Sequence, residues 1–294
     1  METPFNQLFP PLPPKVGSPF WYSGLQSFWL YWKLDPKLAA KYLPQLPGDQ
    51  KLEVAVFDFD DDEATLVSLD LQRYLSGGDS WLETTQEVEF NLYVYPKSRE
   101  PLVPELTWKQ FLMGWDQTKS LGGWRLHVPC DDQVAIDAGK GLFGEPKYLA
   151  QFTTKVPHIN SPETKTWQYY VYVPGKPPPQ PSELMWSLFA DLSDRLPEQY
   201  DASPLIEYGV LIEDGSQHLV ANQWNFYGPF DTYWLDTKPA KVKLATGPAD
   251  LHDTVKDLKT LIGNRAPIAA QVFSSPPVSV ESRGWYQVPN TQTR

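Results

Sequence analysis

The stretch "GKGLFGEPKYLAQF", residues 139–152, places Lys147 directly after a proline and among apolar residues. Lysine is usually a surface residue, so Lys147 could simply end a loop with its amine in water. A lysine amine in an apolar setting has a second use, because a neutral amine attacks a ketone and forms an imine. The protonated imine then withdraws electrons from the neighbouring carbon, which allows loss of carbon dioxide or of a proton. Lys147 is therefore the first candidate catalytic residue.

The pKa of Lys147 decides whether this chemistry is open at neutral pH. At the reference pKa of about 10.4, only roughly one lysine amine in 2,500 is neutral at pH 7. Burial among apolar side chains disfavours the ammonium form, so we expect it to lower the pKa of Lys147. The neighbours expected to bury this amine are Leu142, Phe143, Leu149 and Phe152.

Proton transfer at an imine also requires a carboxylate within reach. The segment "EVEFNLYVYP", residues 87–96, alternates apolar residues with Glu87, Glu89 and Asn91. This period of two predicts a strand with one apolar and one polar face. Glu89 is the candidate acid–base residue and Glu87 the alternative, although Glu89 could equally face solvent.

The lysine segment resembles the motif of the acetoacetate decarboxylase superfamily. Gly139 to Gly141, a short spacer, and then Pro146, Lys147 and Tyr148 match the stretch that carries the Schiff-base lysine in that family. The segments "SFWLYWKLDPKLAAKYLPQL" and "EVEFNLYVYP" resemble two further parts of the family, so the similarity spans roughly residues 20–155. The resemblance implies a Schiff-base lyase in which Lys147 is the nucleophile and Glu89 the strand glutamate. It pairs an earlier glutamate of the family with Glu53.

Two departures from the family pattern bear on the substrate. Tyr148 replaces the family's second lysine, so burial and not an adjacent ammonium would have to lower the pKa of Lys147. Leu25 falls where the family has an arginine that binds the substrate carboxylate, which disfavours acetoacetate, and the aromatic residues of the flanking segments suit a larger ligand. We therefore predict decarboxylation of a β-keto acid bulkier than acetoacetate. The predicted substrate-binding residues are Tyr148, Phe143, Leu25 and Glu53.

Two other functions remain open from the sequence. One is an aldolase–dehydratase of the same superfamily that uses the same lysine. The other is a barrel that binds a small molecule without catalysis, with Leu25 and Tyr148 marking lost activity.

The elements that must position these residues are mostly strands. Strand patterns cover residues 51–59, 87–96 and 167–173. Helices are predicted after the cap Asp35–Pro36, over "SELMWSLFADLSDRL" (182–196), and along the stripe Leu251, Val255, Leu258 and Ile262, which Gly263 ends. The pattern predicts a mainly β fold, an antiparallel barrel or sandwich with flanking helices, and the resemblance implies a double-barrel-like sheet.

The chain divides into a proline-rich arm and a single domain. Residues 1–20 contain six prolines and form the predicted arm, whereas residues 21–294 form one acetoacetate decarboxylase-like domain. The arm also carries apolar side chains that could be buried against a neighbour, and the family assembles, so we predict a homo-oligomer.

Composition excludes several classes of partner. The net charge of −11 repels nucleic acid and anionic membranes, and we find no apolar stretch of the length that a membrane helix needs. The single cysteine and four scattered histidines form no metal-binding pattern, so we predict neither metal nor cofactor. The expected partner is a small carbonyl compound, and the expected location is the cytoplasm.

Overall fold

The structure, a computed structural model, describes residues 21–60, 62–76, 84–158, 160, 164–175, 177–213, 215–250 and 252–275. The predicted arm, residues 1–20, lies outside the described residues, as does Leu251 of the helical stripe. No helix in the described ranges is long and apolar enough to cross a membrane.

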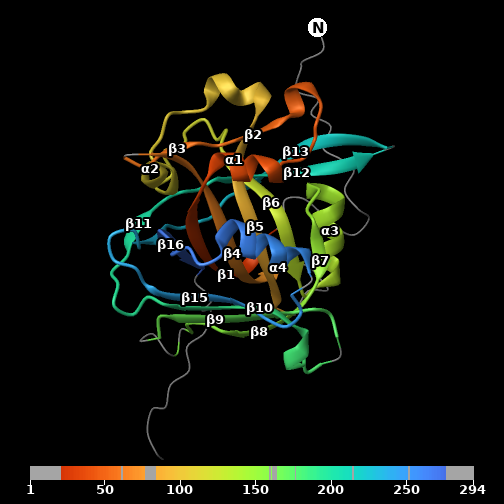
Figure 1. The fold of residues 1–294 in the computed structure, drawn as a ribbon, viewed down its shortest axis with the longest axis vertical. Helices are drawn as coiled ribbons and strands as arrows, with labels where there is room; N and C mark the ends of the chain where they lie inside the picture. Colours follow the sequence, from red (N-terminus) through yellow and green to blue (C-terminus); the bar gives the residue numbers. More distant parts are fainter. Residues whose placement is uncertain are drawn as a thin grey trace, which may run out of the picture.

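Strands dominate the molecule and form two sheets (Figure 1). The main path of the large sheet has the order β11-β14-β16-β1-β4-β5-β6-β12-β13. Its strands are β11 (Glu198–Tyr200), β14 (Phe230–Trp234), β16 (Ala269–Ser274), β1 (Tyr22–Leu34), β4 (Glu63–Ser76), β5 (Thr85–Pro96), β6 (Gly122–Cys130), β12 (Leu205–Glu213) and β13 (Ser216–Trp224). Three short strands pair with it at the side, namely β2 (Leu52–Val54), β3 (Phe57–Asp58) and β7 (Lys147–Leu149).

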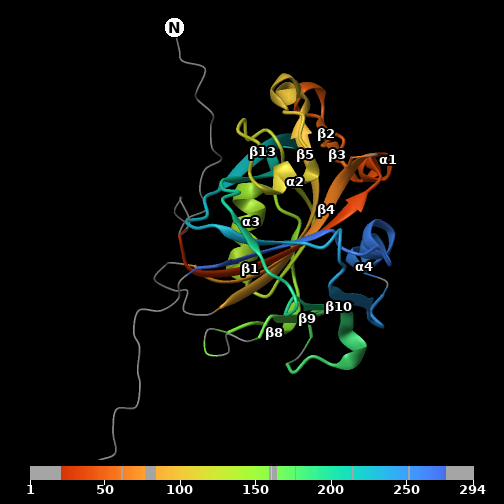
Figure 2. The same ribbon diagram turned by 90° about the vertical axis from the view of Figure 1, so that its left-hand side faces the viewer.

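The second sheet has four strands in the order β15-β10-β9-β8. Their bounds are β8 (Gln151–Lys155), β9 (Thr166–Tyr172), β10 (Leu184–Asp191) and β15 (Lys241–Thr246). The helices are short: α1 (Pro36–Ala39), α2 (Trp108–Leu112), α3 (Gln133–Phe143) and α4 (Asp253–Asp257), with a π-helical turn (Leu258–Ile262) after α4. In Figure 2, α4 lies beside the second sheet, and α3 lies on the other side of the long strands.

The mainly β prediction is therefore confirmed, with one change to the pairing. Most neighbouring strands are antiparallel, but β6 pairs in parallel with both β7 and β12. The large sheet curls back on itself, because the ring of Tyr22 at the start of β1 stacks on Trp224 at the end of β13, with centroids 5.4 Å apart.

The helix predicted over residues 182–196 is wrong, because this segment contains β10. Met185, Trp186, Leu188 and Ala190 are buried there, and β10 pairs on one side with β9 and on the other with β15. Trp186, Leu188 and Ala190 already show a period of two in the sequence. Two neighbouring strands supply the hydrogen bonds, so tertiary pairing outweighs the local helical tendency.

The other helix and strand signals are confirmed with small adjustments. Asp35 caps α1 by accepting from the backbone N–H of Lys37, and Gly263 follows the π-helical turn with a φ of 56°. The strand predicted over residues 51–59 forms as two pieces, β2 and β3.

The two faces of the large sheet have different chemistry. One face packs on the second sheet and α4 to form the main apolar core, where Phe28 stacks on Trp167 with centroids 4.6 Å apart. The register of β1, β4 and β5 places Trp29, Asp70 and Glu89 side by side on the opposite, inner face. Polar residues buried on this inner face include Ser27, Ser68, Asp70, Gln72, Glu87, Glu89, Asn91 and Gln271.

Candidate active site

Lys147 stands at the start of β7, immediately after the turn that ends α3. Asp132 caps the first turn of α3 with its carboxylate, and Gly144 ends the helix in the left-handed conformation, with a φ of 62°. Pairing of Lys147 with Val128 of β6 then directs the lysine side chain toward the inner face. Only 8% of Lys147 is exposed.

The amine of Lys147 is held between two carboxylates. Its Nζ lies 2.9 Å from Oε2 of Glu87 and 3.0 Å from Oε2 of Glu145. Glu87, which the sequence offered as the alternative to Glu89, is thus the glutamate of this strand that contacts the lysine. Glu145 lies two residues before Lys147 in the same motif, and its position beside the lysine is the only sequence signal that could have pointed to it.

Glu89, the predicted acid–base residue, contacts an arginine instead of Lys147. Its Oε1 accepts a hydrogen bond from Nε of Arg125 at 3.0 Å. Arg125 lies on β6 beside a register irregularity in the pairing with β5, and it is almost fully buried. A single arginine within "GGWRLHVPC" carries no motif, so sequence reasoning missed it.

Arg125 is surrounded by carboxylates on every side of its guanidinium. Besides Glu89, it pairs with Glu145 at 3.5 Å and donates from Nη2 to Glu207 of β12. Glu145 therefore bridges the two cations of the site, Arg125 and Lys147. Buried charges of this kind are stable only when they are paired, and here each cation has several partners.

The electrostatics of Lys147 differ from the sequence prediction. Burial alone lowers the pKa of Lys147, but the charges of Glu145 and Glu87 outweigh it and hold the pKa well above its usual value. The prediction that apolar burial lowers the pKa is wrong, because the surroundings of the amine are acidic. The two carboxylates therefore favour the ammonium form of Lys147.

The pKa values of the buried carboxyl groups are shifted in two directions, upward for Glu87 and Asp70 and downward for Glu145. Burial raises the pKa of Glu87, although Lys147 opposes it. Burial also acts to raise the pKa of Glu145, but Arg125 and Lys147 together hold it below its usual value. Asp70 has its pKa raised well above normal, first by burial and then by Glu89. Glu87 is therefore the carboxyl best suited to take a proton from Lys147.

The predicted substrate-binding residues are only partly brought together. Leu25 lies on the inner face opposite Tyr74, whose hydroxyl donates to Oε2 of Glu87 at 3.0 Å. Tyr148 points away from its neighbour Lys147, because successive strand residues alternate, and its hydroxyl lies 2.6 Å from Oγ1 of Thr254.

Two further predicted residues take positions outside the charged cluster. Glu53 pairs with Lys51 at 2.7 Å in a partly exposed ion pair. Phe143 is the last residue of α3, where its carbonyl packs closely against Gly209 of β12. Neither placement supports a role next to the lysine.

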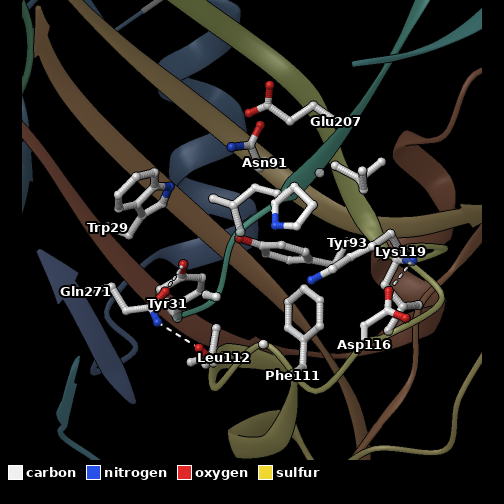
Figure 3. A pocket seen from close by; sticks show the side chains of 17 residues that line it. Trp29, Tyr31, Asn91, Tyr93, Phe111, Leu112, Asp116, Lys119, Glu207 and Gln271 are labelled. Carbon is white, nitrogen blue, oxygen red and sulfur yellow. Dashed lines mark hydrogen bonds between the residues drawn. The ribbon is translucent and has the colours of Figure 1, made fainter. Parts of the chain in front are cut away.

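Two hollows adjoin the cluster. A small cavity of about 50 Å³ on the inner face is lined by aromatic residues and reaches Asn91 and Glu207 (Figure 3). A wider, open hollow of about 580 Å³ lies between α3 and β12 and is lined in part by Arg125, Glu145 and Lys140. The described residues include no group of three or more His, Cys, Asp and Glu side chains that could hold a metal ion.

Comparison with known proteins identifies the fold. Acetoacetate decarboxylase from Legionella pneumophila superposes with a TM-score of 0.53 and 13% identity, over 93% of this chain and 88% of that one. The chain has the acetoacetate decarboxylase fold. The enduracididine biosynthesis enzyme MppR, in its complex with pyruvate, matches this fold with a TM-score of 0.53 and 13% identity, over 88% of this chain and 87% of that one.

A third solved structure with this fold is an acetoacetate decarboxylase-like enzyme from Sphingomonas wittichii, with a TM-score of 0.51, 13% identity, and coverage of 87% of this chain and 88% of the other. No family model matches the sequence, and no curated protein matches it. The resemblance seen in the lysine motif is thus confirmed at the level of the fold.

Proposed function

We propose that this protein is an enzyme that joins Lys147 to a carbonyl substrate as an imine and then makes or breaks a bond at the neighbouring carbon. The observation that carries the proposal is the buried amine of Lys147 held between Glu87 and Glu145, at 2.9 and 3.0 Å. Solved enzymes with the same fold include acetoacetate decarboxylase and MppR in complex with pyruvate. Acetoacetate and pyruvate are both carbonyl compounds, which supports carbonyl chemistry in this fold.

The first step needs the proton of Lys147 to move to a neighbour. Glu87 accepts it, because burial raises the pKa of this carboxyl and stabilises its neutral form. The neutral amine then attacks the carbonyl carbon to form a carbinolamine, and its hydroxyl takes the proton back from Glu87 and leaves as water. The positively charged imine that results takes the place of the ammonium ion beside Glu145, and Glu87 is again a carboxylate. A carboxylate already in contact stabilises that charge without reorganisation.

The imine can react onward in two ways. Loss of carbon dioxide from a β-keto acid leaves an enamine, which takes a proton to complete decarboxylation. Alternatively, a carboxylate removes a proton next to the imine, and the enamine attacks an aldehyde in an aldol reaction, with dehydration as a later step. Each path regenerates Lys147 when water hydrolyses the final imine.

The charge balance of the site favours the aldol path. Five carboxyl groups (Asp70, Glu87, Glu89, Glu145 and Glu207) surround two cations (Arg125 and Lys147). Both cations are already paired, and among the described residues no third cation joins the cluster. A keto-acid carboxylate would enter without a counterion, which is costly in a buried site. MppR has been solved with the condensation product of pyruvate and an aldehyde, which supports condensation chemistry in this fold. Because pyruvate is also a keto acid, the missing counterion favours a neutral ketone over pyruvate as the imine-forming substrate of this protein.

Decarboxylation of a bulky β-keto acid is the second candidate. Its support is the likeness to acetoacetate decarboxylase, whose fold this chain shares. The predicted homo-oligomer and cytoplasmic location stay predictions, and light scattering tests the first of them.

Borohydride trapping tests the proposal directly. The protein is incubated with acetoacetate, pyruvate, an aromatic 2-oxo acid or a neutral ketone, reduced, digested and examined by mass spectrometry. We expect added mass on the peptide that contains Lys147, no such mass in Lys147→Met, and unchanged labelling in Lys140→Met, which alters an exposed lysine of α3. Equal labelling in Lys147→Met would overturn the assignment. Carbon dioxide release or absorbance of a conjugated product then separates the two reactions, and trapping without turnover would favour the binding-only alternative.

A further inference from the structure

The small cavity in Figure 3 has its own chemistry, separate from Lys147. Its walls come from β1, β5, α2, the segments 114–121 and 202–204, the start of β12, and single residues of β6 and β16, and neither Lys147 nor Glu87 lines it. Trp29, Tyr93 and Phe111 form aromatic walls around a volume of about 50 Å³. One water molecule needs about 10–15 Å³ of such volume, so the cavity accommodates a ligand of roughly three to five non-hydrogen atoms.

The side chain of Lys119 lines one end of this cavity. Its side chain is partly buried and, within the described part of the chain, it makes no ion pair or hydrogen bond. Burial lowers the pKa of Lys119, with Asp116 and Asp201 opposing the shift. A bound anion would stabilise an ammonium group in this position, because the ion pair offsets the hydration that the amine loses on burial.

The backbone holds Lys119 in this position at a cost. Lys119 has a φ of 50°, a conformation uncommon for residues other than glycine. The buried carboxylate of Asp116 enforces it by accepting from the N–H and hydroxyl of Thr118 and from the N–H of Leu121. Strained residues of this kind concentrate at functional sites.

Asn91 provides an unpaired acceptor on the same cavity. This side chain is 4% exposed, and its Oδ1 has no hydrogen-bond partner among the described residues. Its Nδ2 donates to the carboxylate of Glu89 at 3.4 Å, which fixes the amide so that the oxygen is the unpaired atom. Glu207 lines the cavity too and adds negative charge there.

Other polar groups on the cavity wall are already paired. Gln271 accepts from the hydroxyl of Tyr31 at 2.7 Å and donates to the carbonyl of Leu112 at 2.9 Å. The hydroxyls of Tyr93 and Ser68 lie 3.1 Å apart. The groups that stand open to a ligand are therefore a cation, Lys119, and an acceptor, Asn91.

We propose that this cavity binds a small carboxylate that carries a hydrogen-bond donor. The carboxylate pairs with Lys119, a hydroxyl or ammonium group donates to Oδ1 of Asn91, and the short carbon skeleton packs against the aromatic wall to which Tyr93 and Phe111 contribute. Glycolate and glycine have this arrangement, acetate has the anion without the donor, and ethylamine has the donor without the anion.

Ligand-observed NMR titration of the full chain with these four compounds tests the site. We expect glycolate or glycine to bind saturably, with acetate and ethylamine about tenfold weaker or more. Lys119→Met should weaken binding of the preferred probe about tenfold or more, the usual effect of losing a charge-assisted hydrogen bond. Lys243→Met, which removes an exposed lysine of β15, should change it less than about twofold.

A second variant keeps the test decisive if Lys119→Met is poorly folded. Asn91→Leu should abolish the preference for glycolate over acetate while acetate affinity stays within about twofold, and circular dichroism checks that each variant is folded. The proposal is overturned if no probe saturates, if Lys119→Met and Lys243→Met behave alike, or if Asn91→Leu retains the preference for the donor-bearing compound.

Discussion

At the scale of single residues, the site is defined by which carboxylate contacts which cation. Glu87 and Glu145 hold Lys147, whereas Glu89 pairs with Arg125. Each of the two carboxylates that hold Lys147 both helps and hinders catalysis. It positions the amine, but it also stabilises the unreactive ammonium form. A substrate must therefore bind before or while the proton passes to Glu87.

The variant Glu87→Gln separates these two effects. Removal of its charge lowers the pKa of Lys147, so imine trapping should reach half its maximum at a lower pH. Trapping at pH 7 should rise by up to about tenfold for each pH unit by which that midpoint falls. Turnover should decrease roughly 10²- to 10⁴-fold, because the proton acceptor is lost. Glu53→Gln, which alters a partly exposed ion pair, should change neither quantity. An unchanged pH profile in Glu87→Gln would contradict the assignment.

Leu25 offers a test of the missing counterion. This residue pairs on the inner face with Tyr74, whose hydroxyl contacts Glu87, and an added guanidinium at this position could pair with a substrate carboxylate. We expect Leu25→Arg to raise trapping or turnover of acetoacetate at least about tenfold, as for one charge-assisted pair. Leu75→Arg, at a partly exposed position of β4, is the matched control. Efficient use of acetoacetate by the unaltered protein would refute the premise.

At the scale of elements, α3 and the turn after it bring the lysine motif against the sheet. The approach to the ion pair is close at Gly139, where a Cβ atom would lie 2.4 Å from Oε2 of Glu145 and 2.6 Å from Cδ of Lys147. The glycine of the motif is therefore needed for space, because α3 packs directly on the ion pair.

Substitution of this glycine should disturb the site while α3 remains helical. Gly139→Ala forces Glu145 or Lys147 to move, so we expect at least about tenfold less imine trapping and a loss of about 1–3 kcal/mol in the free energy of unfolding, as in other overpacked cores. Gly141→Ala, at an exposed position of the same helix, should retain trapping and gain up to about 1 kcal/mol from helix propensity. Urea unfolding and borohydride trapping measure both variants, and equal behaviour of the two would count against this packing argument.

At the scale of the whole molecule, the curled sheet separates an apolar core from a charged interior. The outer face of β1, β4 and β5 contributes Phe28, Leu69 and Phe90 to the core shared with the second sheet. The inner face buries carboxyl groups in excess of cations, so the fold is stabilised by one side of the sheet and strained electrostatically on the other. Asp70 shows this most clearly, because its Oδ1 is buried and has no partner among the described residues.

Stability should therefore fall as the pH rises above the range in which free carboxyl groups titrate. In the unfolded chain Asp70 ionises near pH 4, whereas burial, followed by the charge of Glu89, raises its pKa in the folded protein. Between the two pKa values the folded state binds more protons, so the free energy of unfolding decreases with pH by up to about 1.4 kcal/mol per pH unit. Asp70→Asn should flatten this dependence in urea unfolding between about pH 5 and 8, and Asp137→Asn, on the exposed face of α3, should not. An identical slope in Asp70→Asn would rule out Asp70 as the cause.

Local sequence was enough to identify the candidate lysine, the strand that carries its partner, and the class of fold. Those features depend on neighbouring residues only: a short motif that leads to Lys147, and a period of two in residues 87–96. Features that depend on how strands are aligned required the folded chain. Only the register among β4, β5, β6 and β7 distinguishes Glu87 from Glu89 as the neighbour of Lys147, and only the curl of the sheet brings Arg125 and Glu207 together. The pKa of Lys147 belongs with the second group, because it depends on charges such as Glu87 that are distant along the chain and adjacent in space.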